Sequence, residues 1–275
     1  MRKSELWWLV NVIKGDNKMD FKDGFLDVQL NDFINVFREK HKLEYALIYK
    51  TKSFLDRAQT VLVGKTVPKQ DIFLVASIVE LNKLFQSAIL LFERGLPESA
   101  NILVRSILEL SFKIIELTQN ENFLQEMIQD ISSKTLTTIK KIKQNELFDV
   151  VPEDILDELL VEYQNFKKHK INTDVGVYNL AERNGLNKEY ILYRTYCDYT
   201  HQSIKVIDEI VSVTQEGVSV NGDLRLNDFL ESISLLISIT MISFPWIIQH
   251  FLFDEDLKCQ FDLLQEEFLN VFKRE

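Results

Sequence analysis

The sequence predicts an all-α protein, a bundle of long antiparallel helices. Only 8 glycines and 4 prolines occur in 275 residues, so few positions allow the tight turns that strand-rich folds need. Apolar residues recur at intervals of three and four through most of the chain, which is the spacing of one face of a helix. Hydrophobic residues make up 46% of the sequence, including 19 phenylalanines, and this is enough to fill a deep core.

Local signals mark the ends of the first three helices. Residues 31–63 form the first helical stretch, with apolar residues near helical spacing. The second helix is predicted over residues 71–94, because Gly95 directly after it favours a helix end. Pro97 favours the first turn of the third helix, residues 97–120, where its missing N–H costs least. Because the link is short, the second and third helices are expected to form an antiparallel hairpin.

The middle of the chain predicts four further helices. Two of them cover residues 122–145 and 153–170, where the apolar spacing stays helical. A short helix over residues 175–183 is expected to end at Gly185, and a longer one then covers residues 188–213.

The C-terminal part predicts a turn-rich connection and two more helices. The dipeptide Asn221-Gly222 favours a tight turn, so a small β-hairpin is expected around it. Helices follow over residues 228–252 and 254–273. The chain is therefore expected to have three parts: an N-terminal helical extension (1–69), a helical core domain (70–253) and a C-terminal helix packed on that core (254–275).

The net charge of −10 limits the partners that the sequence favours. An acidic surface repels phosphate backbones, so generic coating of nucleic acid is disfavoured, and no signal specific for DNA is found. Basic runs lie at residues 134–143 and 167–170. They are interpreted either as solvated helix faces or as local basic patches. Cys197 and Cys259 are far apart in the sequence, so neither a disulfide framework nor a cysteine zinc site is expected. The predicted compartment is the reducing cytoplasm.

Residues 232–253 require a membrane test, because no formally charged residue occurs over these 22 positions. That length would span a bilayer. The segment also contains five Ser or Thr residues together with Pro245, Gln249 and His250. Its flanks are acidic and lack the Lys/Arg excess that orients membrane spans. The prediction is a buried core helix, and a membrane-attached sensor is the alternative that the sequence leaves open.

A narrow polar stripe on the helix over residues 97–120 contains the first candidate site residues. Arg105 and Glu109 are four positions apart, so they share a helix face and can pair. Apolar residues cover most of this helix, so the pair is expected to be partly sheltered and to need partners. Two interpretations follow: the pair anchors helix packing, or Arg105 presents its guanidinium to an anion.

The second candidate site lies in the stretch YRTYCDYTHQS, residues 193–203. Seven helical positions make almost two turns, so Arg194 and His201 share a face about 10 Å apart along the axis, with Asp198 between them. Asp198 would orient the imidazole for proton transfer, and Arg194 would hold a phosphate. A surface salt-bridge network is the structural alternative. The tyrosines and Cys197 are expected to face the core.

No metal site and no cofactor are predicted. A ferritin-like di-metal centre needs Glu-x-x-His on two helices and two further carboxylates. Only Asp198-x-x-His201 approaches that spacing, and His41, His169 and His250 have no carboxylate at the required distance in the sequence.

Two stretches resemble a family of bacterial helical proteins that has no assigned chemistry: GLPESANILVRSILELSFKI (95–114) and VYNLAERNGLNKEYILYRTYCDYTHQS (177–203). The shared pattern is a glycine, Arg-Ser-x-x-Glu on an apolar helix, then Ala-x-x-x-Gly-Leu and a helix with tyrosines and a histidine. The matching residues in this chain are Gly95, Glu98, Ala100, Arg105, Ser106, Glu109, Ala181, Gly185, Leu186, Tyr190, Tyr193 and His201. The resemblance covers roughly residues 70–215 and implies a helical fold more than an activity.

Arg194 and His201 are also similar to the Arg-x4–6-His signature of the higher-eukaryote-and-prokaryote nucleotide-binding (HEPN) helical domains. Many of these domains are metal-independent ribonucleases in toxin, phage-defence and CRISPR systems. The resemblance implies a HEPN-like core, a catalytic His201, and an Arg194 that stabilises the phosphate during attack by the RNA 2′-hydroxyl. It also implies a homodimer, because such sites often form across two protomers. Thr195 stands where the commoner pattern has Asn, Asp or His.

Two functions therefore follow from the sequence. The first is a HEPN-like, metal-independent ribonuclease or effector of a bacterial toxin or phage-defence system, centred on Arg194, Asp198 and His201. Arg105 and Glu109 would support this site or bind an anion. The second is a non-catalytic helical interaction or scaffold protein, in which the polar stripes only join helices.

Overall fold

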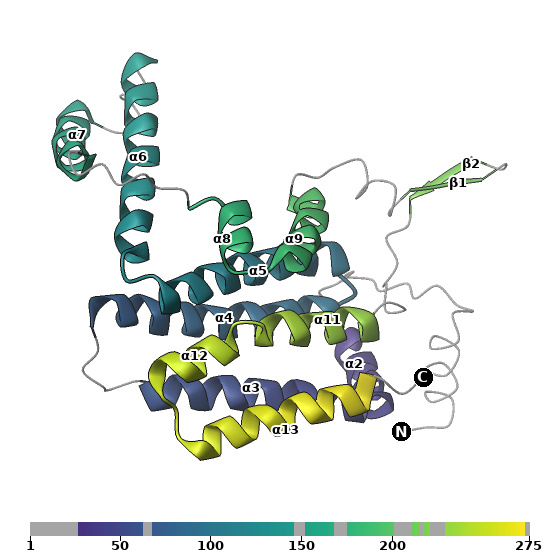
Figure 1. Cartoon of the computed structure of the whole chain (residues 1–275). Helices are drawn as coiled ribbons and strands as arrows, with labels where there is room; N and C mark the ends of the chain where they lie inside the picture. The colour runs from purple at the N-terminus through teal and green to yellow at the C-terminus, as the bar shows by residue number, and fades with distance from the viewer. Residues whose placement is uncertain are drawn as a thin grey trace.

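The computed structural model describes residues 27–62, 68–145, 152–167, 175–200, 211–214, 217–220 and 229–272 (Figure 1). These residues form an all-α multi-helix bundle, as the sequence predicts, with one two-stranded hairpin at its side. The HEPN-like character of the core and the three-part domain division both stay predictions.

The helices and strands follow one another along the chain in a fixed order. They are α2 (Gln29–Lys40), α3 (Lys42–Leu62), α4 (Lys69–Glu93), α5 (Pro97–Gln119), α6 (Phe123–Gln144), α7 (Glu153–Lys167), α8 (Val177–Arg183), α9 (Asn187–Thr200), β1 (Val211–Thr214), β2 (Gly217–Val220), α11 (Phe229–Met241), α12 (Phe244–Phe251) and α13 (Glu255–Phe272).

The antiparallel hairpin of α4 and α5 is the centre of the bundle, and its connection has the predicted form. Gly95 follows α4 with a φ of 68°, a left-handed conformation that glycine adopts without a steric penalty. The N–H of Leu96 donates to the carbonyl of Leu91 at 3.0 Å, which closes the helix end. Pro97 then occupies the first turn of α5. These local signals turn the chain back on itself within three residues.

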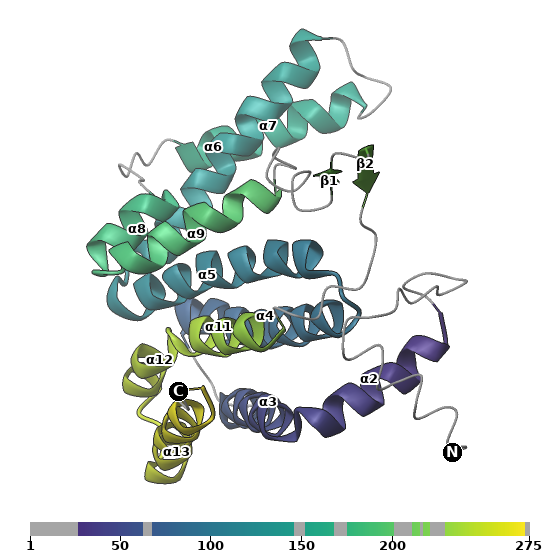
Figure 2. The same cartoon turned by 90° about the vertical axis from the view of Figure 1, so that its right-hand side faces the viewer.

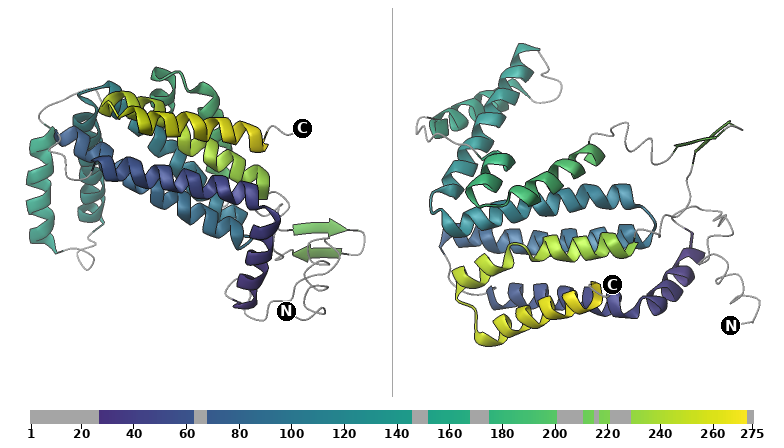
Figure 3. Two further views of the ribbon diagram at one scale, coloured as in Figure 1. Left: turned by 90° about the horizontal axis from the view of Figure 1, so that it is seen from below. Right: turned by 45° about the vertical axis from the view of Figure 1, so that its right-hand side comes forward.

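The other helices lie in layers on either side of this hairpin (Figures 1 and 3). α8 and α9 pack on one side of α5, while α4 and α11 lie on the other. α3 packs against α4 and α11, and α13 packs against α3 to close the bundle. α6 and α7 pack on each other and project from the bundle as an arm (Figure 2).

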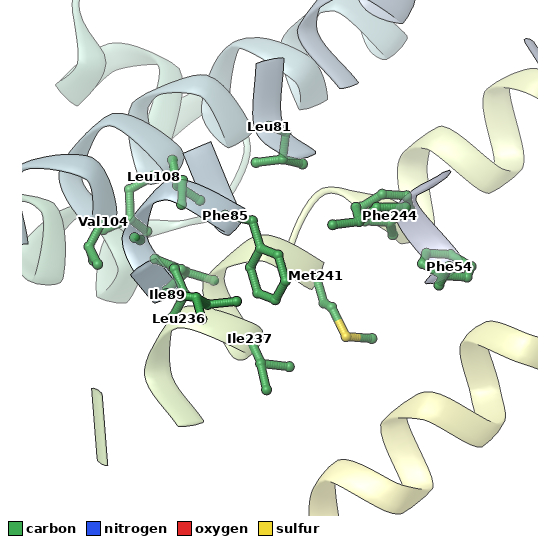
Figure 4. Packing of buried hydrophobic residues seen from close by; sticks show 14 of the residues in the cluster. Phe54, Leu81, Phe85, Ile89, Val104, Leu108, Leu236, Ile237, Met241 and Phe244 are labelled. Atoms are coloured by element: carbon green, nitrogen blue, oxygen red, sulfur yellow. The ribbon is translucent and has the colours of Figure 1, made fainter. Parts of the chain in front are cut away.

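One apolar core runs through these layers. Phe85 of α4, Leu108 of α5 and Ile237 of α11 are fully buried in the same cluster (Figure 4). The ring of Phe54 meets that of Phe244 at 4.9 Å and that of Phe261 at 5.6 Å, which joins α3 to α12 and α13. Removing such a buried ring typically costs about 3–5 kcal/mol, because the cavity collapses only partly.

Two of the predicted helices are divided in the structure. The stretch 31–63 forms α2 and α3, which are separated at His41, where φ is −109° and ψ is 40°. The stretch 228–252 forms α11 and α12, which are separated at Ser243. Pro245 lies in the first turn of α12, and because it lacks an N–H it cannot continue the hydrogen bonds of a single helix.

The prediction of one helix over 188–213 is wrong at its C-terminal end. Val211–Thr214 is strand β1, paired antiparallel with β2 so that Val211 lies opposite Val220. Both strands alternate valine with a small polar residue, a two-residue period that favours strands. The two strands pair with Thr214 opposite Gly217. Asn221-Gly222, around which the sequence predicts the hairpin, lies outside the described residues.

Two segments of the described chain are long and apolar enough to cross a membrane by length and composition alone. They are Lys69–Glu93 and Phe229–Phe251, and 39% and 50% of their most apolar windows are buried inside the bundle. Core helices of globular proteins pass the same test, and Phe229–Phe251 is the pair α11 and α12 described above.

Candidate functional site

A tight connection between α8 and α9 sets where α9 lies. Gly185 follows α8 with a φ of 71°, and the N–H of Leu186 donates to the carbonyl of Ala181 at 2.8 Å. Ala181 and Leu186 are buried, at 0% and 7% exposure, so the connection is also held in the core. The Ala-x-x-x-Gly-Leu pattern is therefore a left-handed helix end that directs α9 across α5.

One face of α9 packs on α5 through aromatic and sulfur side chains. Tyr193 and Cys197 are buried, as the helical spacing predicts, and both lie on this face. The ring of Tyr193 meets that of Phe112 edge-on at 6.4 Å and stacks on that of Tyr190 at 6.0 Å. These contacts favour a single orientation of α9.

Arg105 reaches from α5 into this contact. Its Nη2 donates to the Tyr193 hydroxyl at 2.8 Å, and its Nε donates to Cys197 Sγ at 3.4 Å. The guanidinium carbon also lies 5.0 Å from the centre of the Tyr193 ring, within the range of a cation–π interaction. Burial alone would lower the pKa of Arg105, but the hydrogen bonds to Cys197 and Tyr193 outweigh it and raise the pKa above its ordinary value. Arg105 therefore stays charged at the α5–α9 interface.

Glu109 completes the polar stripe that the sequence predicts on α5. Its Oε2 lies 3.6 Å from Arg105 Nη2, and its Oε1 accepts from Lys113 Nζ at 2.7 Å. The side chains of Arg105 and Glu109 are 22% and 28% exposed, so the pair is partly sheltered. All of these contacts are made within the protein, which agrees with the alternative that the pair anchors helix packing. Binding of an anion by Arg105 stays a prediction.

Arg194 and Asp198 lie on an adjoining, exposed face of α9. They are one helical turn apart, and within the described ranges neither side chain makes a hydrogen bond or an ion pair. Ile191, also on the exposed side, is 68% exposed. His201, the proposed catalytic residue, lies outside the described residues. The structure therefore brings two of the three predicted catalytic residues to one solvent-facing side of α9.

A buried polar cluster at the end of α5 is a feature that spacing does not predict. Glu116 is 5% exposed and accepts from Asn184 Nδ2 at 2.8 Å and from Asn120 Nδ2 at 3.1 Å. Arg183 Nη1 lies 3.2 Å from the same carboxylate. The cluster ties the end of α8 to α5 and so supports the start of α9. The only signal in the sequence is a carboxylate on a nearly apolar helix, which has to find partners.

A second pair that the sequence does not predict joins α12 to α4. His250 Nε2 lies 2.9 Å from Asp71 Oδ1, with side-chain exposures of 26% and 17%. The two residues are 179 positions apart, so no sequence spacing could have indicated the contact. Within the described ranges, no group of three or more His, Cys, Asp or Glu side chains is placed to hold a metal ion.

The fold and the site define a helical-bundle protein whose helix α9 has a buried aromatic face and an exposed charged face. The chain belongs to a family of unknown function, DUF5677, which matches residues 71–218, more than half of its length. The matched region includes α5, α8 and α9 and most of α4, and it confirms the prediction of a family without assigned chemistry. Among curated proteins and solved structures, nothing matches the chain.

Proposed function

We propose that the chain is a HEPN-like ribonuclease that cleaves RNA without a metal ion, at a site centred on Arg194, Asp198 and His201. The observation that supports it most is the contrast between the two faces of α9. The buried face is held by Arg105 through Tyr193 and Cys197, whereas Arg194 and Asp198 face solvent and contact no other described polar group. Charged groups on a rigid helix that are free of structural partners are available to a ligand.

The chemistry assigned to each residue follows from its side chain. His201 removes the proton of the RNA 2′-hydroxyl, and the 2′-oxygen attacks the adjacent phosphorus. The bond from phosphorus to the 5′-oxygen breaks, which leaves a 2′,3′-cyclic phosphate and a 5′-hydroxyl that takes its proton from water. Arg194 stabilises the negative charge on the phosphate oxygens, and Asp198 orients the imidazole. Every group in this scheme comes from the chain, from RNA or from water.

RNA binding by an acidic protein requires a local basic surface. Lys140 and Lys141 on α6 are exposed, and their ammonium groups form no ion pair with any described residue. Lys134 and Lys143 of the same helix are instead paired with Asp130 and Asp157. We propose that the unpaired lysines of the arm, Lys140 and Lys141, contact RNA. We also propose that the protein works as a homodimer in the cytoplasm.

The test is RNA cleavage by the purified chain in the presence of a chelator. His201→Ala is expected to reduce the rate by about 100-fold or more, the usual effect of removing a general base. Arg194→Ala should reduce it similarly, whereas Lys188→Ala, which removes a charge from the exposed side of the first turn of α9, should leave it within about 2-fold of the unmodified rate. Products ending in a 2′,3′-cyclic phosphate support the scheme. Equal cleavage by His201→Ala, with an unchanged melting temperature, contradicts it.

A non-catalytic interaction or scaffold protein is the second candidate. It is favoured by the internal contacts of Arg105 and Glu109, which leave little of that pair for a ligand. In this case Arg194→Ala would weaken binding to a protein partner or to a second copy of the chain, and no RNA cleavage would be measured. Sedimentation of Arg194→Ala beside the unmodified chain tests for loss of a homodimer.

A further inference from the structure

α12 lies beside the end of α5 and the start of α4, near the point where α6 leaves α5 (Figure 1). A groove is formed there by residues of α5 and α12. It has a volume of about 400 Å³, within the range of small-molecule sites. The groove is lined by Thr118, Gln119, Trp246, Gln249 and His250. None of these residues belongs to α9, so the groove is separate from the site proposed above.

The walls of the groove are held by polar contacts behind its surface. Gln70 Nε2 donates to the carbonyls of Leu117 at 2.7 Å and Asn120 at 3.1 Å, which joins the start of α4 to the end of α5. His250 Nε2 is held 2.9 Å from the carboxylate of Asp71. The groove is therefore formed before a ligand arrives, which reduces the entropy lost on binding.

The lining combines an aromatic surface with unused hydrogen-bonding groups. Trp246 is half-buried against the core and is one of the residues that line the groove. Gln249 is exposed, and its amide makes no hydrogen bond to any described residue. Gln119 donates through Nε2 to Asn184 at 3.1 Å, so its carbonyl oxygen stays available as an acceptor. When Nε2 of His250 donates to Asp71, its Nδ1 is a further acceptor.

This combination selects for a class of ligand. A simple anion is disfavoured, because the carboxylate of Asp71 lies directly behind the imidazole. An aliphatic ligand would leave the Gln249 amide and the Gln119 carbonyl oxygen without a partner. A planar nitrogen heterocycle stacks on the indole and presents both donors and acceptors at its edge. We propose that this groove binds a nucleobase, with Trp246 as the stacking surface and Gln249 as the edge contact.

Adenine is the base expected to bind best. A glutamine amide offers one donor and one acceptor in a plane, which matches N7 and N6 of adenine. The base can belong to a free nucleotide or to an RNA strand, since the stacking and edge contacts involve only the base. Calorimetric titration separates the two sources when adenosine monophosphate and a 2′-O-methylated oligoadenylate, which cannot be cleaved, are compared.

Trp246→Ala is expected to weaken binding of whichever ligand binds by about 10-fold or more, because base–aromatic stacking is lost. Trp246→Phe keeps a ring for stacking and should retain most of the affinity. It is also a control for folding, because a loss of binding in Trp246→Ala alone can come from misfolding of that variant. Gln249→Ala should reduce the preference for adenine over uridine. Gln265→Ala is the matched control, because Gln265 lines a different groove beside α13.

Three outcomes are informative. Binding of the mononucleotide supports a free-nucleotide site, and binding of the oligonucleotide alone supports a base subsite for RNA. Absence of binding by both ligands, or binding that Trp246→Ala and Gln249→Ala leave unchanged, overturns the proposal. His201→Ala distinguishes this groove from the α9 site, because it should abolish cleavage and leave base binding intact.

Discussion

Arg105 and Tyr193 join α5 to α9 through a 2.8 Å hydrogen bond from guanidinium to phenol, with the guanidinium also near the face of the same ring. Tyr193 directly precedes Arg194 in the chain, so the buried and the exposed side chain point in directions about 100° apart around the helix axis. The contact on the buried face therefore sets the rotation of α9 about its axis, and with it the direction of the exposed charges. Arg105 is in this sense a positioning residue.

Removing Arg105 is expected to destabilise the fold. Arg105→Ala removes the donor to the Tyr193 hydroxyl and to Cys197 Sγ, so both groups lose their hydrogen-bond partner. This change should lower the unfolding free energy by about 2 kcal/mol. Tyr193→Phe removes only the hydroxyl and should cost about 1 kcal/mol. Urea unfolding followed by circular dichroism measures both. If the residues act through each other, the double variant costs less than the sum of the single ones; strict additivity would show that they are independent.

Leu252 is expected to be a position where glycine stabilises the protein. It caps α12 with a φ of 47° and a ψ of 52°, a left-handed conformation that disfavours side chains with a Cβ. Its side chain is 83% exposed, so little apolar contact is lost on removing it. Leu252→Gly should raise the unfolding free energy by about 1 kcal/mol.

The control for this prediction is the reverse change at another left-handed position. Gly185 has a φ of 71°, and an added Cβ would meet no atom within 4 Å. Gly185→Ala should therefore lower stability by about 1 kcal/mol through the backbone alone. Leu252→Ala keeps a Cβ and should change little. A Leu252→Gly variant that is no more stable than Leu252→Ala would contradict the backbone argument.

Local features of the fold were predictable from the sequence, and contacts distant in sequence were not. Gly95 with Pro97, and Gly185 after α8, act within a few residues, so the ends of α4, α5 and α8 follow from local chemistry. Pro245 indicates the break between α11 and α12. The continuous uncharged run around it nevertheless favours a single helix, which is what the sequence predicts for residues 228–252. The valine–serine alternation of β1 is too short to be separated from the helical pattern that precedes it.

The candidate site shows the same division. Helical spacing predicts that Arg194 and Asp198 share a face and that Cys197 lies on an adjoining face toward the core. It cannot predict that Arg105 bonds to Tyr193, because those residues are 88 positions apart. Pairs such as His250 with Asp71 depend on how whole helices pack, and a single sequence contains no direct signal for that.

The pair of Arg38 and Glu93 is expected to be the most sensitive ion pair of the described bundle to single substitution. Arg38 donates to both carboxylate oxygens of Glu93, at 2.7 and 2.9 Å, and Glu93 is 3% exposed. Arg38→Ala would leave a buried carboxylate without its cation and should cost about 3 kcal/mol. Replacing both residues, as in Arg38→Met with Glu93→Leu, should recover most of that loss. Chemical denaturation of the single and double variants tests this, and a double variant as unstable as Arg38→Ala would oppose it.

The stability of the bundle should fall as the pH decreases through the range in which His41 gains a proton. Burial lowers the pKa of His41 below its ordinary value; Glu44 acts in the opposite direction, and Lys40 adds to the lowering. Its ring lies 4.5 Å from that of Phe37, at the junction of α2 and α3. Because the unfolded chain takes up the proton more readily than the folded one, the contribution is fully present above a pH of about 6.5 and is lost at lower pH.

Unfolding free energies measured at intervals between about pH 7.5 and 5.5 test this relation around the ordinary histidine pKa. His41→Gln keeps a polar side chain that does not titrate, so its stability should fall less over the range than that of the unmodified chain. The other three histidines are common to both proteins, so the difference between the two curves reports on His41 alone. Parallel curves would mean that burial at the α2–α3 junction does not hinder protonation. A difference that grows as the pH falls would show that the break between α2 and α3 is packed tightly enough to disfavour a charge.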